Sequence, residues 1–416
     1  MLAFGTLGLS SAEGRNIGGL ASTPPMGWNP YYHYGCRLDE GIVHRIADAM
    51  VSSGMRARGY RYVNLDDCWM AFDRDARGDL QPDRVRFPSG IKALARYVHA
   101  RGLRLGIYLD AGSKTCAQRP GSAGHHSQDA RRVARWSVDF VKVDWCNTGN
   151  VFARPVYARL RAALAHTGRS IVFSICNWGL DRPWRWGPKI GAQMWRTAGD
   201  LTWYGAPPDW WGAIQRQARA TQRVASYAHR GGWNENDVLL AGVNTLNEPG
   251  SATPTGDPAT GSLSEEEARA QFSLWSMQAS PLLTDNDITS MSKPTRDTLL
   301  NPEVIAVDQD RLAAPSRIVA RYRGTVQLST RRLDNGDWAL LVLNPETWGF
   351  HTVVNLRRIG LGAARYASRD LWTHRSRRPS ARLAIVMPPT SAAMFRLRRT
   401  GGATSRTPSP GTRGSR

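Results

Sequence analysis

Between residues 24 and 312, short apolar runs alternate along the chain with longer segments whose apolar side chains recur at helical spacing. This alternation is typical of a parallel sheet whose strands are joined by crossover helices. The expected strands are residues 25–28, 60–66, 103–109, 140–144, 171–175, 194–196, 238–241 and 281–284. Because eight parallel strands can close on themselves, the sequence predicts an α/β fold with a (β/α)8 TIM barrel.

Two of the expected helices have clear start or stop signals. Residues 39–55 carry Ile42, Ile46 and Met50 near helical spacing, with Gly54 close to the end. The segment Ser264-Glu265-Glu266-Glu267 has the form of a capping box that opens a helix running to residue 280. The preceding stretch, 244–261, is rich in Gly, Pro, Ser and Thr, which predicts a long surface loop.

From about residue 318 the pattern changes to alternating strands joined by hairpin turns. The clearest hairpin places WALLVL after Asp334-Asn335-Gly336-Asp337. We therefore expect a leader at 1–21, a catalytic barrel at 22–312, an antiparallel β-sandwich domain at 313–399 and a disordered basic tail at 400–416. The tail prediction rests on the absence from that segment of any apolar side chain larger than alanine.

The large net charge of the chain does not change the predicted fold or point to a specific nucleic-acid partner. The net charge is +21, and ten arginines with no acid follow Asp370, so about half of the excess lies in the last 46 residues. No zinc-finger spacing, RNA-recognition signature or basic run interleaved with aromatics is present, which argues against specific nucleic-acid binding. Adhesion to polyanions in general is still expected, because it needs only charge. No apolar run approaches the roughly 20 residues that span a bilayer, so no membrane segment is expected.

Five cysteines lack both C-x-x-C spacing and histidine companions, so the sequence predicts no metal site. The cysteines by themselves are consistent with five buried thiols, and their spacing does not specify a disulfide pairing. The N-terminal stretch MLAFGTLGLSSAEGR has a short apolar segment but no positive start, so it is either a signal-peptide remnant or a frayed leader.

Acidic and aromatic residues close several of the expected barrel strands. Asp66 and Asp67 end VNLDD, Tyr108 lies in GIYLD, Asp144 ends VKVD, and WRTAGD supplies Arg196 and Asp200. Each acid alone could simply cap the next helix. Because the carboxyl ends of all barrel strands meet at one mouth, several such residues together predict an active site.

Lys142 and Asp144 are two residues apart on one strand, so both side chains point to the same side of the sheet. A lysine inside an apolar strand is costly unless it is paired or reaches a polar cavity. It either forms a structural ion pair or contacts a substrate hydroxyl and favours the ionised form of Asp144.

Several stretches of the chain, in order, resemble glycoside hydrolase family 27, the α-galactosidases or melibiases. They are TPPMGWN (23–29), NLDDCWM (64–70), LGIYLDAGSKTC (105–116), FVKVDWCN (140–147), WRTAGD (195–200), GGWNENDVL (231–239), FSLWSMQASPLLTDNDI (272–288), EVIAVDQD (303–310) and RDLW (369–372). The resemblance spans about residues 22–398. It implies a barrel followed by a β domain, and hydrolysis of terminal α-galactosyl groups.

The resemblance also implies roles for individual residues. Asp144 would be the nucleophile and Asp200 the general acid/base of a retaining mechanism, which needs two carboxyl groups and neither cofactor nor metal. Asp66 and Asp67 would accept the 4- and 6-hydroxyls of galactose. The remaining expected sugar contacts are Trp28, Tyr108, Lys142, Cys176, Asn177, Arg196 and Asp237.

By the same resemblance Cys36 would pair with Cys68, and Cys116 with Cys146, while Cys176 would be a pocket residue. Two disulfides favour a secreted protein, because disulfides persist in oxidising compartments. Nothing in the sequence specifies an oligomeric state.

Four departures from the family pattern affect specificity. Asn177 stands where many members have Glu near the 2-hydroxyl, and Glu235-Asn236-Asp237-Val238 replaces Asp-Pro-Asp-Met. The 244–261 segment is longer than usual, and Tyr31-Tyr32 replaces a more typical Ser-Trp. The leading interpretation is hydrolysis of α-D-galactosides of oligosaccharides or galactomannan. The alternatives are another specificity of the family, such as a β-L-arabinopyranosidase, and a non-catalytic carbohydrate-binding protein on the same fold.

Overall fold

The computed structural model describes residues 19–201, 209–243 and 263–400. The expected leader and basic tail, and the predicted loop at 244–261, therefore lie almost entirely outside the described residues. Within those ranges, no helix has the length and apolar character needed to cross a bilayer.

Eight parallel strands form a curled sheet in the order β7-β6-β5-β4-β3-β2-β1-β8, which is the predicted (β/α)8 barrel. The strands are β1 Met26–Trp28, β2 Tyr62–Leu65, β3 Arg104–Asp110, β4 Phe140–Asp144, β5 Val172–Cys176, β6 Met194–Arg196, β7 Trp233–Glu235 and β8 Leu282–Thr284. The ring is completed by a parallel bridge between Leu239 and Thr284. Seven of the eight expected strands are confirmed, because the observed strands overlap them.

The seventh strand was predicted wrongly. The apolar run at 238–241 was expected to pair with its neighbours, but β7 is Trp233–Glu235, which pairs with β6 in register with Met194–Arg196. Val238 and Leu239 follow β7 in the chain and are buried. Of the run 238–241, only Leu239 contributes to the sheet, through its bridge to Thr284. The apolar run therefore contains the contact that closes the barrel and is not itself a strand. The strand β7 lacks an apolar pattern because it contains Asn234 and Glu235, which are polar and buried.

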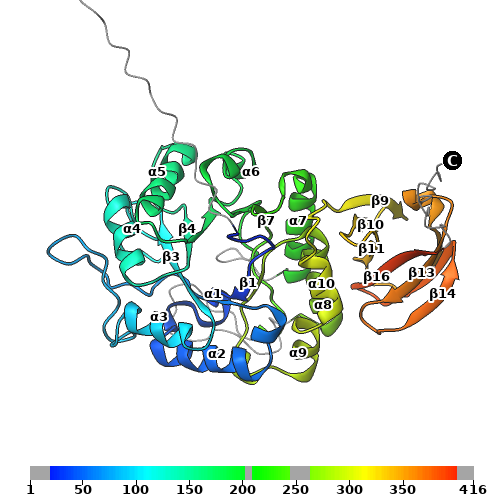
Figure 1. The fold of residues 1–416 in the computed structure, drawn as a ribbon, viewed down its shortest axis with the longest axis horizontal. Coiled ribbons are helices and arrows are strands. Elements are labelled where there is room, and N and C mark those ends of the chain that lie inside the picture. The colour runs from blue at the N-terminus through cyan, green and yellow to red at the C-terminus, as the bar shows by residue number, and fades with distance from the viewer. Residues whose placement is uncertain (1–18, 202–208, 244–262, 401–416) are drawn as a thin grey trace, which may run out of the picture.

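Helices surround the sheet (Figure 1). They are α1 Tyr31–Tyr34, α2 Glu40–Ser52, α3 Ile91–His99, α4 His126–Arg135, α5 Ala153–His166, α6 Pro183–Trp186, α7 Trp210–Arg223, α8 Glu265–Gln278, α9 Lys293–Leu299 and α10 Pro302–Asp308. The predicted N-terminus of α2 is confirmed, since the Asp39 side chain accepts a hydrogen bond from Ile42 N at 2.7 Å. The capping box of Ser264 and Glu267 at α8 is also confirmed.

The C-terminal domain is an antiparallel β structure built of two layers. One sheet has the order β14-β13-β16-β11-β10-β9 and the other pairs β12 with β15. The strands are β9 Arg317–Tyr322, β10 Val326–Arg332, β11 Trp338–Asn344, β12 Phe350–Asn355, β13 Arg365–Asp370, β14 Ser376–Ser380, β15 Arg382–Met387 and β16 Ser391–Thr400. The predicted hairpin at Asp334–Asp337 joins β10 and β11.

The six-stranded sheet has apolar side chains on both faces, with the alternation expected of a strand. On β11, Leu340 and Val342 belong to the core of the β domain, whereas Leu341 and Leu343 belong to the core that is continuous with the barrel. The second face packs on α8, where buried Arg331 donates to Ser276 O at 2.9 Å. This explains why most of α8 is buried: it lies between the barrel and the β domain (Figure 1).

Candidate active site

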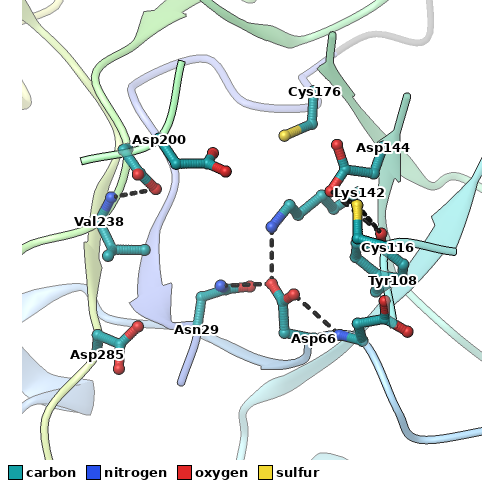
Figure 2. A network of polar contacts seen from close by, with 12 residues as sticks. Asn29, Asp66, Tyr108, Cys116, Lys142, Asp144, Cys176, Asp200, Val238 and Asp285 are labelled. Carbon is teal, nitrogen blue, oxygen red and sulfur yellow. Dashed lines mark hydrogen bonds and ion pairs between the residues drawn. The ribbon is translucent and has the colours of Figure 1, made fainter. Parts of the chain in front are cut away.

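The polar side chains predicted from strand ends converge at the carboxyl end of the barrel (Figure 2). Asp144 is the last residue of β4, Arg196 is the last of β6, and Asp66 directly follows β2. Asp200 lies four residues beyond β6. In Figure 2 the carboxyl groups of Asp144 and Asp200 point toward one another, and the Lys142 side chain lies below and between them.

The lower part of this cluster is an ion pair between Lys142 and Asp66. Lys142 Nζ lies 2.8 Å from Asp66 Oδ2, and Asn29 Nδ2 donates to the same oxygen at 2.7 Å. Burial lowers the pKa of the Lys142 ammonium, but the Asp66 and Asp144 carboxylates outweigh it and hold that pKa well above its ordinary value. Lys142 is therefore a fixed positive charge in the cluster.

Asp144 is buried and held in one orientation. Its Oδ1 accepts a hydrogen bond from Trp145 N at 2.9 Å, and its Oδ2 accepts one from Tyr108 Oη at 3.1 Å. Burial raises the pKa of Asp144 to about 7, the Lys142 ammonium opposes that rise, and the Asp200 carboxylate adds to it. The environment therefore keeps this carboxyl close to the point where it gains or loses a proton near neutral pH.

Arg196 joins Asp200 to Asp237 on the opposite side of the cluster. One guanidinium nitrogen lies 2.8 Å from Asp200 Oδ1 and 3.1 Å from Asp237 Oδ2. The arginine is fully buried, whereas the Asp200 side chain is 36% exposed. Burial raises the pKa of Asp200 and the Arg196 guanidinium lowers it, with a net upward shift. Asp200 is thus an accessible carboxyl whose proton affinity depends on Arg196.

Asp67 is oriented by backbone amides. Its oxygens accept from Cys68 N at 2.6 Å and Ala117 N at 2.9 Å, and burial raises its pKa. The first amide belongs to Cys68 and the second to the residue after Cys116, and both cysteines form disulfides. The structure contains the two expected disulfides, Cys36 with Cys68 and Cys116 with Cys146, each with a Cα–Cα distance of 5.2 Å. The disulfides therefore fix the loops that hold Asp67.

Three expected sugar contacts have surroundings that the sequence did not indicate. Trp28 is completely buried, and its indole N–H donates to Asn286 O at 2.9 Å. Asn177 is also buried; its amide nitrogen donates to Leu180 O within the same turn, and its Oδ1 has no hydrogen-bond partner in the described part of the chain. Cys176 is a buried free cysteine whose sulfur lies 3.6 Å from Arg196 Nη1. The structure thus brings Cys176 into the cluster but turns the amide of Asn177 to its own loop.

Four further residues belong to the cluster, although sequence reasoning did not select them as site residues. They are Asn29, Tyr32, Glu235 and Asp285. Tyr32 Oη donates to Asp237 Oδ2 at 2.6 Å, and Asp285 accepts hydrogen bonds from the backbone amides of Tyr32 and His33 at 2.9 and 2.7 Å. Asp285 directly follows β8, so the rule that selected the other strand-end acids would have found it.

Glu235 was missed because the strand that it ends was placed five residues too late. In the observed register Glu235 pairs with Arg196 on the neighbouring strand, so both side chains point to the same side of the sheet. Burial raises the pKa of Glu235 to about 7, although the Arg196 guanidinium lowers it. Glu235 is a further buried carboxyl on the Arg196 side of the cluster.

Among the described residues, one group places possible metal-ligand atoms close together. Asp110, Cys116, Asp144 and Cys146 bring such atoms within 4.8 Å of one another. Cys116 and Cys146 are bonded to each other, so their sulfurs are not thiolate ligands. Of the four residues, only the carboxyl groups of Asp110 and Asp144 then remain as possible ligands.

A (β/α)8 barrel with carboxyl groups gathered at the carboxyl ends of its strands can supply the two carboxyl groups that a glycoside hydrolase needs. Residues 23–310 match the family described as alpha galactosidase A, and residues 323–397 match the alpha galactosidase C-terminal beta sandwich domain. The chain is 39% identical over 381 residues to an α-galactosidase of Oryza sativa subsp. japonica, covering 91% of this chain and 85% of that protein. It is 41% identical over 358 residues to one of Coffea arabica, covering 86% and 88% of the two chains.

A solved structure indicates the same family. The crystal structure of α-galactosidase I from Mortierella vinacea superposes with a TM-score of 0.82 at 30% identity, covering 91% of this chain and 98% of that one. The chain therefore belongs to the α-galactosidase (melibiase) family, glycoside hydrolase family 27.

Proposed function

We propose that this protein is a retaining exo-glycosidase that hydrolyses terminal α-D-galactosyl groups of oligosaccharides or galactomannan. The observation that carries the proposal is the pair of carboxyl groups, Asp144 and Asp200, which point toward one another with a cation beside each. Retaining glycosidases use two carboxyl groups about 5–5.5 Å apart, one to attack the sugar and one to move the proton.

Asp144 is the proposed nucleophile. One of its oxygens forms a bond to C1 of galactose while the bond from C1 to the leaving oxygen breaks. The role requires an ionised carboxylate, which the Lys142 ammonium favours. The hydrogen bonds from Trp145 N and Tyr108 Oη fix the direction of attack.

Asp200 is the proposed general acid and base. It gives a proton to the departing oxygen in the first step and takes one from water in the second, as that water attacks C1 and releases Asp144. The role requires a carboxyl that is protonated when substrate arrives, and burial raises its pKa in that direction. Its partial exposure leaves room for the leaving group and then for water.

The remaining side chains are the proposed sugar-binding residues. Asp66, Asp67 and Lys142 contact the 4- and 6-hydroxyls and their neighbours, while Arg196 and Cys176 lie near the 2-hydroxyl. A binding site that hydrogen-bonds a hydroxyl strongly rejects a sugar that places it elsewhere, because buried polar groups are then left unpaired. Tyr108 and Asp237 complete the polar wall, and Trp28 and Asn177 are kept as further candidate contacts.

The direct test is the rate of p-nitrophenol release from four aryl glycosides: α-D-galactopyranoside, β-L-arabinopyranoside, N-acetyl-α-D-galactosaminide and α-D-glucopyranoside. We expect the α-galactoside to be the preferred substrate and the first-formed sugar to have the α configuration. Preference for the arabinoside would leave the assignment of the catalytic pair unchanged, but the proposed sugar would then be wrong. Absence of release from all four would overturn the enzyme assignment in favour of a binding protein.

Single substitutions separate the two roles. Asp144→Asn should abolish turnover of every substrate. Asp200→Ala should lower kcat about 10²- to 10⁴-fold for a substrate with a poor leaving group and less for an activated one, since general acid assistance matters least there. Azide should rescue Asp200→Ala with formation of an α-galactosyl azide, because azide replaces the water that attacks the covalent intermediate and the configuration at C1 is retained. Full activity of Asp144→Asn would contradict the assignment.

The disulfides support a location in an oxidising compartment, and we propose that the protein is secreted. Titration of the unfolded, unreduced protein taken from its natural source should find one thiol per chain, that of Cys176. Five thiols per chain would place the protein in a reducing compartment.

A further inference from the structure

Two loops at the carboxyl end of the barrel expose apolar side chains to solvent. Val151 and Phe152 precede α5 and are 51% and 79% exposed, and Leu180 lies between β5 and α6 and is 52% exposed. These loops follow β4 and β5, so they lie at the same end of the barrel as Asp144. Exposed apolar groups that gather on one face commonly mark a binding surface.

Two cavities with basic linings flank these apolar residues. The first has a volume of about 880 Å³, is lined in part by Val151 and includes Arg131 and Arg159 together with His125 and His126. The second has a volume of about 510 Å³ and includes Arg154, Arg182, Arg185 and Lys189. The helices α5 and α6, which carry several of these residues, are neighbours in Figure 1. Residues 151–154 therefore connect one basic cavity to the other.

The six cations of these cavities have no acidic partner among the described residues. None of Arg131, Arg154, Arg159, Arg182, Arg185 and Lys189 forms an ion pair there, although nearby Arg74 pairs with Asp129 at 2.7 Å. The one carboxylate in either lining is Asp181, which accepts a hydrogen bond from Ala153 N at 3.2 Å. Clustered like charges raise the energy of the folded chain and attract counter-ions, most strongly inside a concave surface.

We propose that this surface binds an acidic polysaccharide, a chain bearing uronate or sulfate groups, and guides its galactosyl end into the active site. We call it the basic platform: the apolar side chains of Val151, Phe152 and Leu180 with the six cations of the two cavities. The apolar faces of sugar rings pack on Phe152 and Leu180, while anionic substituents enter the cavities and pair with the arginines. The site of hydrolysis is the one proposed above, so the substrate role of the platform rests on that function.

The concave form of the platform favours a polymer over a membrane. A membrane contact places apolar groups and cations on a surface that meets a lipid layer as a whole. Here the cations line cavities of about 880 and 510 Å³, where they reach groups that enter from a flexible chain. Charged clefts of this kind concentrate oppositely charged ligands.

The test measures binding directly, apart from catalysis. The full chain is titrated with fluorescein-labelled oligogalacturonate and, as the neutral probe, labelled malto-oligosaccharide, and the dissociation constants are obtained from fluorescence anisotropy at two ionic strengths. The platform variant combines Arg182→Ser, Arg185→Ser and Lys189→Ser. The matched control combines Arg357→Ser, Arg358→Ser and Arg378→Ser, three exposed arginines of the β domain, so both variants lose the same charge.

We expect oligogalacturonate to bind, the neutral probe not to bind, and the platform variant to bind about tenfold more weakly than the control, in line with the loss of three exposed ion pairs. Phe152→Ser should weaken the binding that remains at high salt, where charge interactions are screened. Hydrolysis of p-nitrophenyl α-galactoside should be unchanged in all three variants, so a failure of the proposed enzyme function is seen separately.

Equal loss of binding in the platform and control variants would overturn the proposal, because net charge alone would then explain it. No binding of oligogalacturonate would also overturn it. Tighter binding to phosphatidylglycerol vesicles than to oligogalacturonate, lost in the platform variant, would replace the polysaccharide with a membrane surface.

Discussion

The Arg196 guanidinium lies 2.8 Å from Asp200 Oδ1, so the proposed acid/base is paired with a fully buried cation before substrate binds. The same nitrogen also lies 3.1 Å from Asp237, whose position is fixed by Tyr32 Oη and Leu201 N. Arg196 therefore has two carboxylate partners in the free enzyme and can keep one when it contacts a sugar hydroxyl. Substrate binding that draws Arg196 away from Asp200 would raise the pKa of that carboxyl and help it hold its proton.

Replacing Arg196 with Met should shift the alkaline side of the pH profile of kcat/KM. The guanidinium lowers the pKa of Asp200, so its removal raises that pKa and keeps the acid protonated to higher pH. We expect the alkaline limb to move up by about one unit, together with a lower kcat/KM. Arg216→Met, which removes an exposed cation paired with Asp209, is the control and should leave the limb in place. An unmoved limb in Arg196→Met would argue against Asp200 as the acid.

Replacing Lys142 with Met should shift the opposite side of the profile. The ammonium lowers the pKa of Asp144, so its removal raises that pKa and more of the nucleophile is protonated at a given acidic pH. The acidic limb of kcat/KM should then move up by about one unit. Lys142→Arg keeps the charge and should leave the limb near its original position, even if hydrolysis is slower. A shift to lower pH would contradict the proposed role of Asp144.

Glu235 makes stability depend on pH in a predictable direction. Burial raises its pKa from 4.5 to about 7, so between these values the folded chain holds a proton that the unfolded chain has lost. Wild-type stability should therefore fall as pH rises through that window, by about 3 kcal/mol from this group alone. Glu235→Gln does not titrate, and its free energy of unfolding minus that of wild type should increase from pH 4.5 to 7 and then level off.

The control for this measurement is Glu303→Gln, followed by urea unfolding over the same pH range. A hydrogen bond from Arg369 lowers the pKa of Glu303, so its contribution is present at neutral pH and lost as pH falls. The two variants should diverge from wild type in opposite directions. A difference for Glu235→Gln that does not vary with pH would show that this carboxyl is not buried in solution.

The two disulfides should stabilise the chain equally but affect catalysis differently. They close loops of 32 and 30 residues, so removing either by paired Cys→Ser substitution should cost about 3–4 kcal/mol of unfolding free energy in urea. Only the Cys116–Cys146 pair contacts the proposed nucleophile, with Cys116 Sγ 3.6 Å from Asp144 Oδ2. We expect its removal to lower kcat/KM of the folded enzyme, measured well below the midpoint of unfolding. Equal activity loss in the Cys36–Cys68 variant would remove this distinction.

Much of the barrel could be predicted because its strands are buried on both faces. Such strands appear in the sequence as apolar runs, and seven of the eight were found in this way. The strand β7 was missed because it contains two buried polar residues, Asn234 and Glu235, so its pattern is not apolar. Asn234 is hydrogen-bonded to the Trp195 indole and to Val224 O. The apolar run at 238–241 fits the pattern of a buried strand better than residues 233–235 do, and it was therefore predicted as the seventh strand. Of its residues, only Leu239 bridges to a neighbouring strand.

The sequence by itself determined the barrel, the β domain and the acids that end the strands, since burial selects apolar residues and the carboxyl ends of parallel strands share one face. Only the tertiary structure decided which polar groups meet. The pairing of Lys142 with Asp66, the division of Arg196 between Asp200 and Asp237, and the inclusion of Glu235 and Asp285 depend on contacts between residues far apart in the chain. Hydrogen bonds and ion pairs act over a few ångströms, and linear spacing does not specify such distances between separate strands.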